Sequence, residues 1–255
     1  MSKKVSLIST GKRQGIFIEL VKSIQESLNQ VCEHELYWTY RNNFDFPKSD
    51  VNIIVHGKHL GDPLPKDSIN ILVHTEQRVK NVKGYDLVLN LFPNYGTYLP
   101  LGYSKYFDNS QNVQEDIPIY FFGALKGKRQ GIRARHNVKV HHCYGEERDR
   151  LICRAKFNVN FNFSKTWMYT PLRGILVMAK GKMFFQEHAS GYKYHKPYLT
   201  LFNEQNFHQT LEKWSDEKKR KEHGMYIREE LMKQPFKETF LKLIYEHFNE
   251  DIFRE

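Results

Sequence analysis

Hydrophobic residues in the first hundred positions form short continuous runs, with one stretch of helical spacing between the first two. The runs are "KVSLIST" (4–10), "HELYWTY" (34–40), "VNIIVHG" (51–57), "INILVHT" (69–75) and "YDLVLNL" (85–91). Continuous apolar runs of this length are typical of strands buried on both faces of a parallel sheet. The helical spacing is carried by Phe17, Leu20, Val21, Ile24 and Leu28. The pattern predicts an α/β domain with a parallel sheet.

A second series of strands and helices begins at Ile117. Strands are predicted over 117–123, 138–144, 157–163 and 182–187, and helices over 145–156 and 170–181. Pro171 suits the first turn of the latter helix, and Gly181 suits its C-terminal stop. The last fifty residues have a helical pattern with a break near Pro235. One apolar stripe on the final helix is formed by Phe236, Phe240, Leu243, Ile244 and Phe248.

The polar segment 105–116, "KYFDNSQNVQED", separates the two series. We therefore predict an N-terminal Rossmann-like domain over 1–105, a linker over 106–116 and a second Rossmann-like domain over 117–234. Two such halves predict a cleft, because sheets of this kind place ligands beyond the carboxyl ends of their strands. Gly123 ends the first strand of the second half, so the basic residues after it would point into that cleft.

Composition narrows the class of protein. The chain is 40% hydrophobic and contains 18 Phe and 15 Tyr residues, which argues against disorder. No apolar run approaches the roughly 20 residues that span a bilayer, and the N-terminus reads as a strand instead of a secretory signal. The three cysteines, Cys32, Cys143 and Cys153, have no metal-ligand spacing. We expect a soluble, cytoplasmic protein without a disulfide framework.

The net charge of +10 is concentrated in the middle of the chain. Residues 116–200 carry 16 basic and 5 acidic side chains, whereas residues 1–115 carry 13 and 12. Residues 201–255 carry 10 basic and 12 acidic side chains. A charge excess of one sign favours a phosphate-rich ligand, because a solvated face usually mixes its signs.

Four segments in this order resemble the nucleotide-sugar half of GT-B glycosyltransferases. They are "YLPLGYSKYF" (98–107), "IPIYFFGALKGKRQGI" (117–132), "YGEERDRLICRAKFNVNFNF" (144–163) and "TPLRGILVMAKGKMFFQE" (170–187). The resemblance is clearest over residues 70–190. It implies a compact GT-B enzyme whose second domain holds a nucleoside diphosphate sugar and whose first domain holds the acceptor. It further implies that no metal or other cofactor is needed and that the C-terminal helix, 235–255, returns to the first domain.

The resemblance assigns donor-binding roles to residues of the second half. Gly123 and the basic turn with Lys128 and Arg129 would lie beside the diphosphate, where cations stabilise the charge of the leaving group. Arg173, at the start of a predicted helix, would act with the partial positive charge of that helix end. Many relatives have a ribose-binding Glu where this chain has Leu176, so Glu187 is our candidate for that contact. A solvated basic turn and an exposed structural Arg are the alternatives.

Candidates for the acceptor side follow strands of the first half. The turn "STGKRQG" contains Gly11, Lys12 and Arg13 and either approaches an acceptor phosphate or is a purely structural turn. His56 and Glu76 each follow a strand end, where either could act as the base for an attacking hydroxyl. The chemistry does not choose between retention and inversion, since a retaining reaction can use the leaving phosphate as its base.

Several acceptors fit these features. Small GT-B enzymes of bacterial viruses glycosylate hydroxymethylated pyrimidines in DNA, and the basic excess suits double-stranded DNA from which a base is flipped. Such an enzyme would work in the host cytoplasm. Nearby aromatic residues that could stack on bases are Trp167, Tyr169, Tyr192 and Tyr194. The alternatives are a saccharide, lipid or protein acceptor, or a non-catalytic nucleic-acid-binding module on the same fold, which Leu176 favours.

Overall fold

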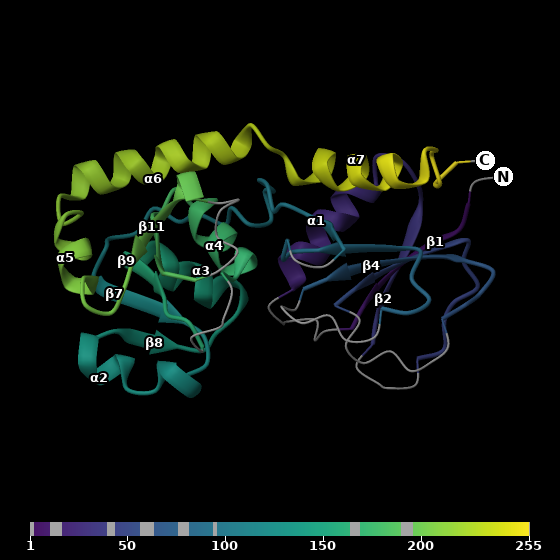
Figure 1. Ribbon diagram of the computed structural model, residues 1–255. Coiled ribbons are helices and arrows are strands. Elements are labelled where there is room, and N and C mark those ends of the chain that lie inside the picture. Colours follow the sequence, from purple (N-terminus) through teal and green to yellow (C-terminus); the bar gives the residue numbers. More distant parts are fainter. Residues whose placement is uncertain are drawn as a thin grey trace. The chain divides into compact units, whose positions relative to one another are not determined.

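The chain forms two compact units (Figure 1). Unit 1 comprises Met1–Leu101 and Pro235–Glu255, and unit 2 comprises Gly102–Gln234. This computed structural model describes residues 3–10, 17–39, 44–56, 64–75, 82–93, 96–163, 169–189 and 196–254. None of the helices within these ranges is long and apolar enough to cross a membrane. Cys32, Cys143 and Cys153 are free thiols.

Unit 1 is built on a six-stranded parallel sheet. Its strand order is β2-β1-β3-β4-β5-β6. The strands are β1 (Val5–Ser9), β2 (His34–Trp38), β3 (Val51–Val55), β4 (Ile69–His74), β5 (Leu87–Asn90) and β6 (Thr97–Tyr98). Every residue of β1 and β3 is buried, as the continuous apolar runs predicted, because both strands lie inside the sheet.

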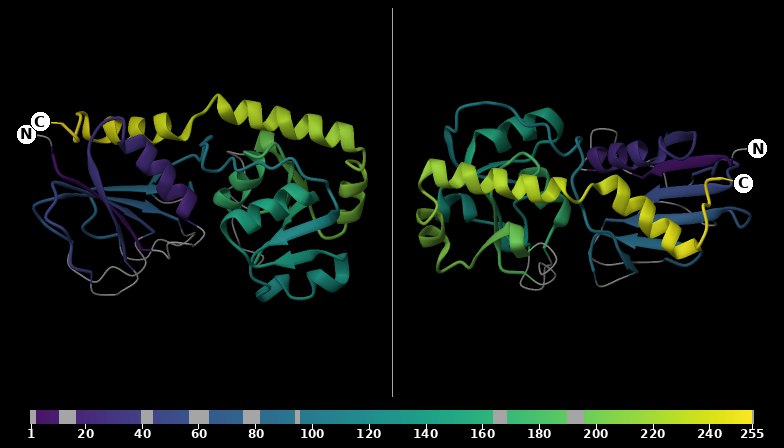
Figure 2. Two further views of the ribbon diagram at one scale, coloured as in Figure 1. Left: turned by 180° about the vertical axis from the view of Figure 1, so that it is seen from behind. Right: turned by 90° about the horizontal axis from the view of Figure 1, so that it is seen from above.

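Two helices far apart in the sequence pack together in unit 1. Helix α1 (Ile18–Leu28) buries Leu20, Val21, Ile24 and Leu28 completely. Helix α7 (Phe236–Phe248) packs against it and buries Phe236, Phe240 and Ile244 (Figure 2). The apolar stripe of the last helix therefore places the C-terminus on the first sheet's unit, as expected.

Unit 2 contains a five-stranded parallel sheet in the order β11-β10-β9-β7-β8. The strands are β7 (Ile117–Phe122), β8 (Lys139–His141), β9 (Ala155–Asn160), β10 (Phe184–Glu187) and β11 (Leu199–Phe202). The second strand in the chain, β8, lies on one side of β7, and the third, β9, lies on the other. Successive strands are therefore added on one side of β7 and then on the other. The position between β7 and β9 is the topological switch point, where open α/β sheets bind ligands.

Helices connect these strands. They are the 3₁₀ helices η1 (Gly127–Arg129) and η3 (Lys196–Tyr198), and the α-helices α2 (Ile132–His136), α3 (Gly145–Arg154), α4 (Pro171–Met178), α5 (Phe207–Glu212) and α6 (Glu217–Met232). Helix α3 packs on β7 and β9, and α4 packs on β10 and α6. The strands β6 and β11 and the short helix α2 were not predicted, because each is too short to show a clear period.

The segment 106–116, for which we expected a linker, lies within unit 2, which begins at Gly102. Phe107 is completely buried, and its carbonyl accepts a hydrogen bond from the Lys180 ammonium. The polar residues that suggested a solvated segment have buried or half-buried partners. Asp108 pairs with Arg228, and Glu115 pairs with Arg220 and Lys182. The polar composition of this segment therefore reflects ion pairs with other parts of unit 2 and not a solvated linker.

The close approach of α6 to the end of α4 gives a stability prediction. A Cβ atom at Gly224 would lie 2.2 Å from the carbonyl oxygen of Gly181, which is backbone and cannot rotate away. In an exposed helix Gly→Ala stabilises by about 1 kcal/mol. We expect Gly224→Ala instead to lower the free energy of unfolding by about 1–3 kcal/mol in a urea titration, because overpacking dominates. Lys218→Ala, on the exposed side of α6, is the control and should change little; a Gly224→Ala protein as stable as the parent would contradict the packing.

Candidate functional site

The predicted donor residues of unit 2 meet at the carboxyl edge of its sheet. Gly123 follows β7, Glu187 ends β10, and Arg173 lies in the first turn of α4. Lys128 and Arg129 lie in η1, in the turn after β7. The group is therefore located beside the switch point between β7 and β9.

Two buried arginines share one aromatic ring. The guanidinium carbons of Arg129 and Arg173 lie 5.2 Å and 5.3 Å from the centre of the Phe121 ring. The two residues are only 6% and 7% exposed. Arg129 Nε donates to the carbonyl of Phe161 over 2.7 Å, and Arg173 Nη1 donates to Asn160 Oδ1. Contacts from β7 and the end of β9 thus orient both guanidinium groups. Arg173 is therefore not an exposed structural arginine, whereas Lys128 in the basic turn is partly exposed.

These two charges lack acidic partners. Among the residues that the structure describes, neither Arg129 nor Arg173 forms an ion pair, and Arg173 Nε has no hydrogen-bond partner. Burial, together with the smaller effect of the neighbouring Arg129 charge, lowers the pKa of Arg173 to about 9. Burial likewise lowers the pKa of Arg129 to about 10, against the opposing effect of Glu187. Two neighbouring desolvated cations are costly, and an anion bound between them would relieve the cost.

Glycine at position 123 makes room for one of these groups. Gly123 has a φ of 155°, and a Cβ atom there would lie 3.0 Å from both Arg173 Nη2 and Phe121 Cζ. Gly127, with a φ of 57°, brings the turn within reach of β9, since the amide of Lys128 donates to the carbonyl of Phe163 over 3.1 Å. The anchored turn directs Arg129 inward and leaves Lys128 at the surface.

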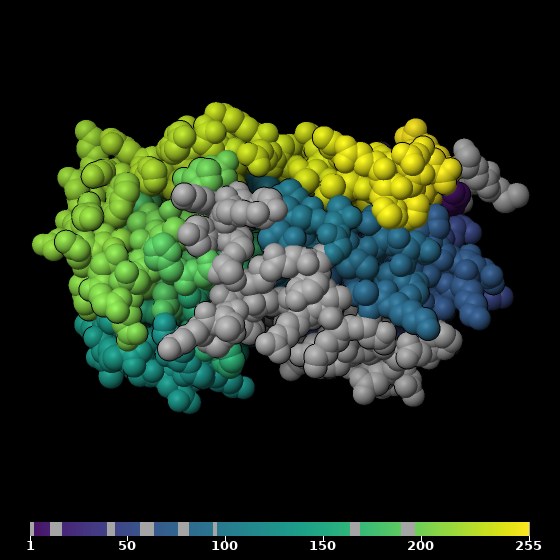
Figure 3. Space-filling view, in the orientation of Figure 1, coloured from purple at the N-terminus to yellow at the C-terminus, as the bar shows by residue number. Residues whose placement is uncertain are grey.

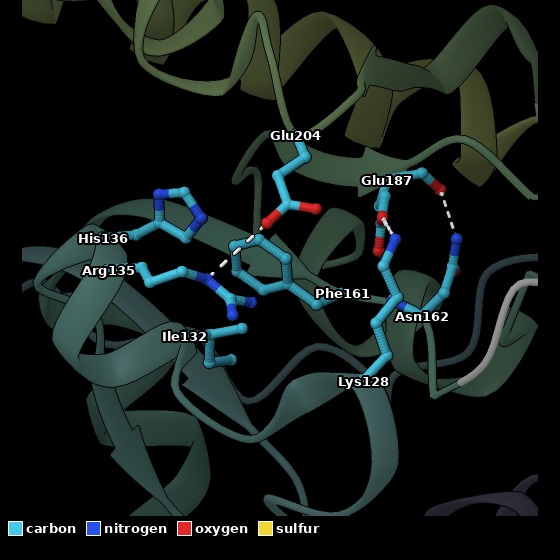
Figure 4. Close-up of a pocket in the computed structure, with 8 residues that line it drawn as sticks. All are labelled: Lys128, Ile132, Arg135, His136, Phe161, Asn162, Glu187 and Glu204. Carbon is cyan, nitrogen blue, oxygen red and sulfur yellow. Dashed lines mark hydrogen bonds and ion pairs between the residues drawn. The ribbon is translucent and has the colours of Figure 1, made fainter.

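Glu187 joins the basic turn to a small pocket (Figure 4). One of its carboxylate oxygens accepts from the ammonium of Lys128, and the other accepts from the amide of Asn162 over 2.7 Å. The pocket is lined by Lys128, Ile132, Arg135, His136, Phe161, Asn162, Glu187 and Glu204. Leu176 is completely buried in α4. Glu187 is therefore the carboxylate that unit 2 presents at the end of β10.

The sequence did not point to His136, Arg135 or Glu204 as residues of this pocket. The His136 ring stacks on Phe161 with 5.6 Å between centres, and its Nδ1 lies 3.3 Å from His208 Nε2. Arg135 Nε lies 3.6 Å from Glu204 Oε1, and both side chains are about half exposed. Glu204 follows β11, a strand that the sequence pattern missed, so no local signal could place it here.

In unit 1, His56 lies just after β3 in a conformation that is uncommon for a residue with a side chain. Its φ is 81°, and only 7% of it is exposed. Its Nδ1 lies 2.5 Å from Thr75 Oγ1, and its ring lies 4.7 Å from that of Phe17. Thr75 follows β4, so the contact joins two neighbouring strand ends. The other acceptor-side candidates, Gly11, Lys12, Arg13 and Glu76, lie outside the described residues.

One further expectation, on the aromatic residues, can be compared with the structure. Tyr169 is 1% exposed, so it cannot stack on a base at the surface, contrary to our expectation. The other aromatic candidates, Trp167, Tyr192 and Tyr194, lie outside the described residues. No three His, Cys, Asp or Glu side chains within the described ranges are grouped as a metal site would require.

Comparison with known proteins identifies the fold. No protein-family model and no curated protein matches the sequence. An α-glucosyltransferase solved with UDP and a 13-mer DNA containing a central A:G mismatch is 13% identical, with a TM-score of 0.57 over 94% of this chain and 99% of that chain. WaaG, a glycosyltransferase involved in lipopolysaccharide biosynthesis, is 9% identical, with a TM-score of 0.57 over 94% and 98%.

An α1,3-fucosyltransferase, solved also with GDP-fucose, is 11% identical, with a TM-score of 0.53 over 99% of this chain and 92% of that chain. These likenesses show that the chain has the GT-B fold, as the sequence resemblance predicted. The fold consists of two parallel sheets with helices, and the likeness extends over nearly the whole chain.

The arginine pair gives a binding prediction. Inorganic pyrophosphate should raise the melting temperature of the protein, because an anion bound only to the folded state stabilises it by about 2.7 kcal/mol at 100 times its Kd. Arg173→Met should abolish most of this shift. Arg150→Met, which removes an exposed charge from α3, is the matched control and should retain it. Equal pyrophosphate shifts in both variants would show that Arg173 does not bind the anion.

His136 gives a pH prediction. Burial, followed by the charges of His208 and Arg135, lowers its pKa in the folded protein. The unfolded chain therefore takes up the proton first, so stability that is present above about pH 6.5 is lost as the pH falls below that value. We expect His136→Gln to reduce the loss of unfolding free energy between pH 7.5 and 5.5. The slope with pH is the measured quantity, with exposed His142→Gln as the control; an unchanged slope for His136→Gln would refute the assignment.

Proposed function

We propose that the protein is a glycosyltransferase that moves a sugar from a nucleoside diphosphate sugar to a hydroxyl group. The observation that carries the proposal is the pair of buried guanidinium groups, Arg129 and Arg173, at the sheet's switch point, where no carboxylate of the described residues pairs with either. The GT-B fold supports it, because structures of that fold with similar chain length have been solved with UDP and with GDP-fucose.

In the proposed reaction the bond between the anomeric carbon and the β-phosphate oxygen breaks, and its electron pair remains on the leaving diphosphate. Arg129 and Arg173 would stabilise that charge by hydrogen bonds to the phosphate oxygens. The N-terminal end of α4, eight residues long, adds the partial positive charge of its helix dipole at the same edge. No reorganisation is needed at that moment, because β7 and β9 already hold both guanidinium groups.

Lys128 and Glu187 have a different proposed role. They form an ion pair at the mouth of the pocket, and Lys128 is partly exposed. A carboxylate beside a lysine can accept hydrogen bonds from the ribose hydroxyls while the lysine contacts a phosphate. We therefore assign the ribose contact to Glu187 and a second phosphate contact to Lys128.

The attacking hydroxyl must lose a proton. In an inverting reaction His56 would accept it, and Thr75 would orient the imidazole through Nδ1. Glu76 remains a second candidate base. In a retaining reaction the leaving phosphate would accept the proton instead. Proton transfer to His56 requires the neutral form of its imidazole. Because only the inverting route uses His56 as the base, replacing His56 distinguishes the two routes.

For the acceptor, we propose a hydroxymethylated pyrimidine in double-stranded DNA. The support is the excess of basic residues in 116–200, which exceeds what two phosphates require. One structure of similar fold was solved with a DNA oligonucleotide. The free thiols of Cys143 and Cys153 fit a reducing compartment, and we propose that the reaction takes place in the cytoplasm.

The activity test offers labelled UDP- and GDP-sugars with duplexes that contain hydroxymethylcytosine, hydroxymethyluracil or neither. We expect label on hydroxymethylated DNA only. Arg129→Met should lower kcat/KM by about 100-fold or more, as loss of one preorganised donor does, while Arg150→Met stays near the parent. Transfer to a saccharide, lipid or protein and never to DNA would refute the acceptor. If no nucleoside diphosphate stabilised the protein, the proposal that it is a glycosyltransferase would be refuted.

A further inference from the structure

The loop after β7, helix α2 and strand β8 form a stretch of chain that is basic throughout. From Gly123 to Tyr144 it contains six Lys and Arg residues and no Asp or Glu. Seven of its basic side chains are exposed. Six of them, all except Lys139 at the start of β8, are here called the basic rim: Lys126, Lys128, Arg133, Arg135, His141 and His142. Only Arg129 of the Lys and Arg residues in this stretch is buried, at the anion site already described.

The topology brings the rim to one edge of unit 2. Strand β8 is the terminal strand of the sheet and runs parallel to β7, with His141 opposite Phe122. The histidines at the end of β8 therefore lie at the same carboxyl edge as the turn that carries Lys126. Helix α2 begins directly after that turn, which places Arg133 there too. In Figure 3 the atoms of this stretch, coloured teal, lie at the surface of unit 2.

The rim contains charges that the protein does not neutralise. Lys128 pairs with Glu187, Arg135 lies 3.6 Å from Glu204, and His141 lies 3.6 Å from Glu147. Within the described residues, Lys126 and Arg133 have no carboxylate partner. Their charges are therefore available to an external anion.

The backbone that presents these charges is held firmly. The amide of Lys128 bonds to Phe163, and the amide of Arg129 bonds to Lys126 over 3.2 Å. A Cβ atom at Gly127 would lie 2.8 Å from the Phe163 carbonyl oxygen, so the turn is packed directly on the chain that follows β9. A preorganised turn loses little entropy when a ligand binds.

We infer that the basic rim binds the phosphate backbone of double-stranded DNA and so brings the DNA to the donor site. This inference rests on the proposed function, since it assigns a surface to the proposed acceptor. DNA presents one negative charge per about 1.7 Å of helix axis, which suits several cations along one edge. A membrane surface fits less well, because interfacial binding needs an apolar face and this stretch exposes only Leu125 and Tyr144 among large hydrophobic side chains.

The test compares the double variant Lys126→Ala/Arg133→Ala with the matched control Lys218→Ala/Lys221→Ala. The control removes the same charge from exposed positions on α6. Binding of a fluorescent 20-base-pair duplex is followed by anisotropy between 50 and 200 mM salt. The slope of log K against log salt should become less steep by about 2 in the rim variant, because each lost phosphate contact contributes about 0.9. The control should keep the parent slope.

An unchanged slope in the rim variant would overturn the inference, as would a parent protein that does not bind the duplex at 50 mM salt. Binding to vesicles of anionic lipid without binding to DNA would also overturn it. Thermal shifts with UDP and GDP distinguish this result from failure of the proposed function. They should be equal in the parent and the rim variant, because neither Lys126 nor Arg133 belongs to the donor site. Thermal shifts with nucleotides but no DNA binding would contradict DNA binding by the basic rim and would leave the proposed glycosyltransferase activity unaffected.

Discussion

The arrangement of unit 2 depends on holding two guanidinium groups together out of water. Arg129 and Arg173 repel each other, and desolvation adds to the cost, yet both contact the Phe121 ring. The carbonyl of Phe161 and the amide oxygen of Asn160, both at the end of β9, compensate part of that cost. Glycine at position 123 leaves room for the Arg173 guanidinium, because a Cβ atom there would lie 3.0 Å from Arg173 Nη2. A fold that maintains such a pair without carboxylates keeps a place for a ligand that supplies the negative charge.

The basic excess of the chain has two physical uses in unit 2. Away from the carboxyl edge, cations are consumed in buried ion pairs: Lys180 with Asp149, Arg220 and Lys182 with Glu115. The two pairs with Glu115 tie α6 and the chain after α4 to the segment 106–116, and the Lys180–Asp149 pair ties the chain after α4 to α3. At the carboxyl edge, by contrast, Arg129, Arg173 and the exposed Lys126 and Arg133 lack acidic partners among the described residues. The separation of paired from unpaired cations is what distinguishes structural charge from charge that is available to a ligand.

Numbered in chain order within each unit, the two sheets share a strand order that begins 2-1-3-4-5, and in each the polar candidates follow the carboxyl ends of strands. His56 and Thr75 follow β3 and β4 in unit 1, while in unit 2 Arg129 lies in η1, in the turn after β7, and Asn160 ends β9. Parallel strands end at one edge, so residues distant in sequence become neighbours there. The strained backbone of His56 and the tight turn at Gly127 are further consequences of bringing polar groups together at such edges.

The sequence by itself determined the α/β class, the strands that are buried on both faces, the return of α7 and the location of the basic turn. The class, the buried strands and the basic turn depend on local periodicity or on chain order, which a strand or helix imposes on its own residues, whereas the return of α7 was implied by the resemblance to GT-B chains. Only the tertiary structure decided which cation is buried, since Lys128 and Arg129 are adjacent and differ in the partners that β9 and β10 offer them. It alone assigned Asp108 and Glu115 to ion pairs, and Glu204 to the pocket. Burial and charge pairing depend on groups supplied by distant segments, and no local pattern encodes those partners.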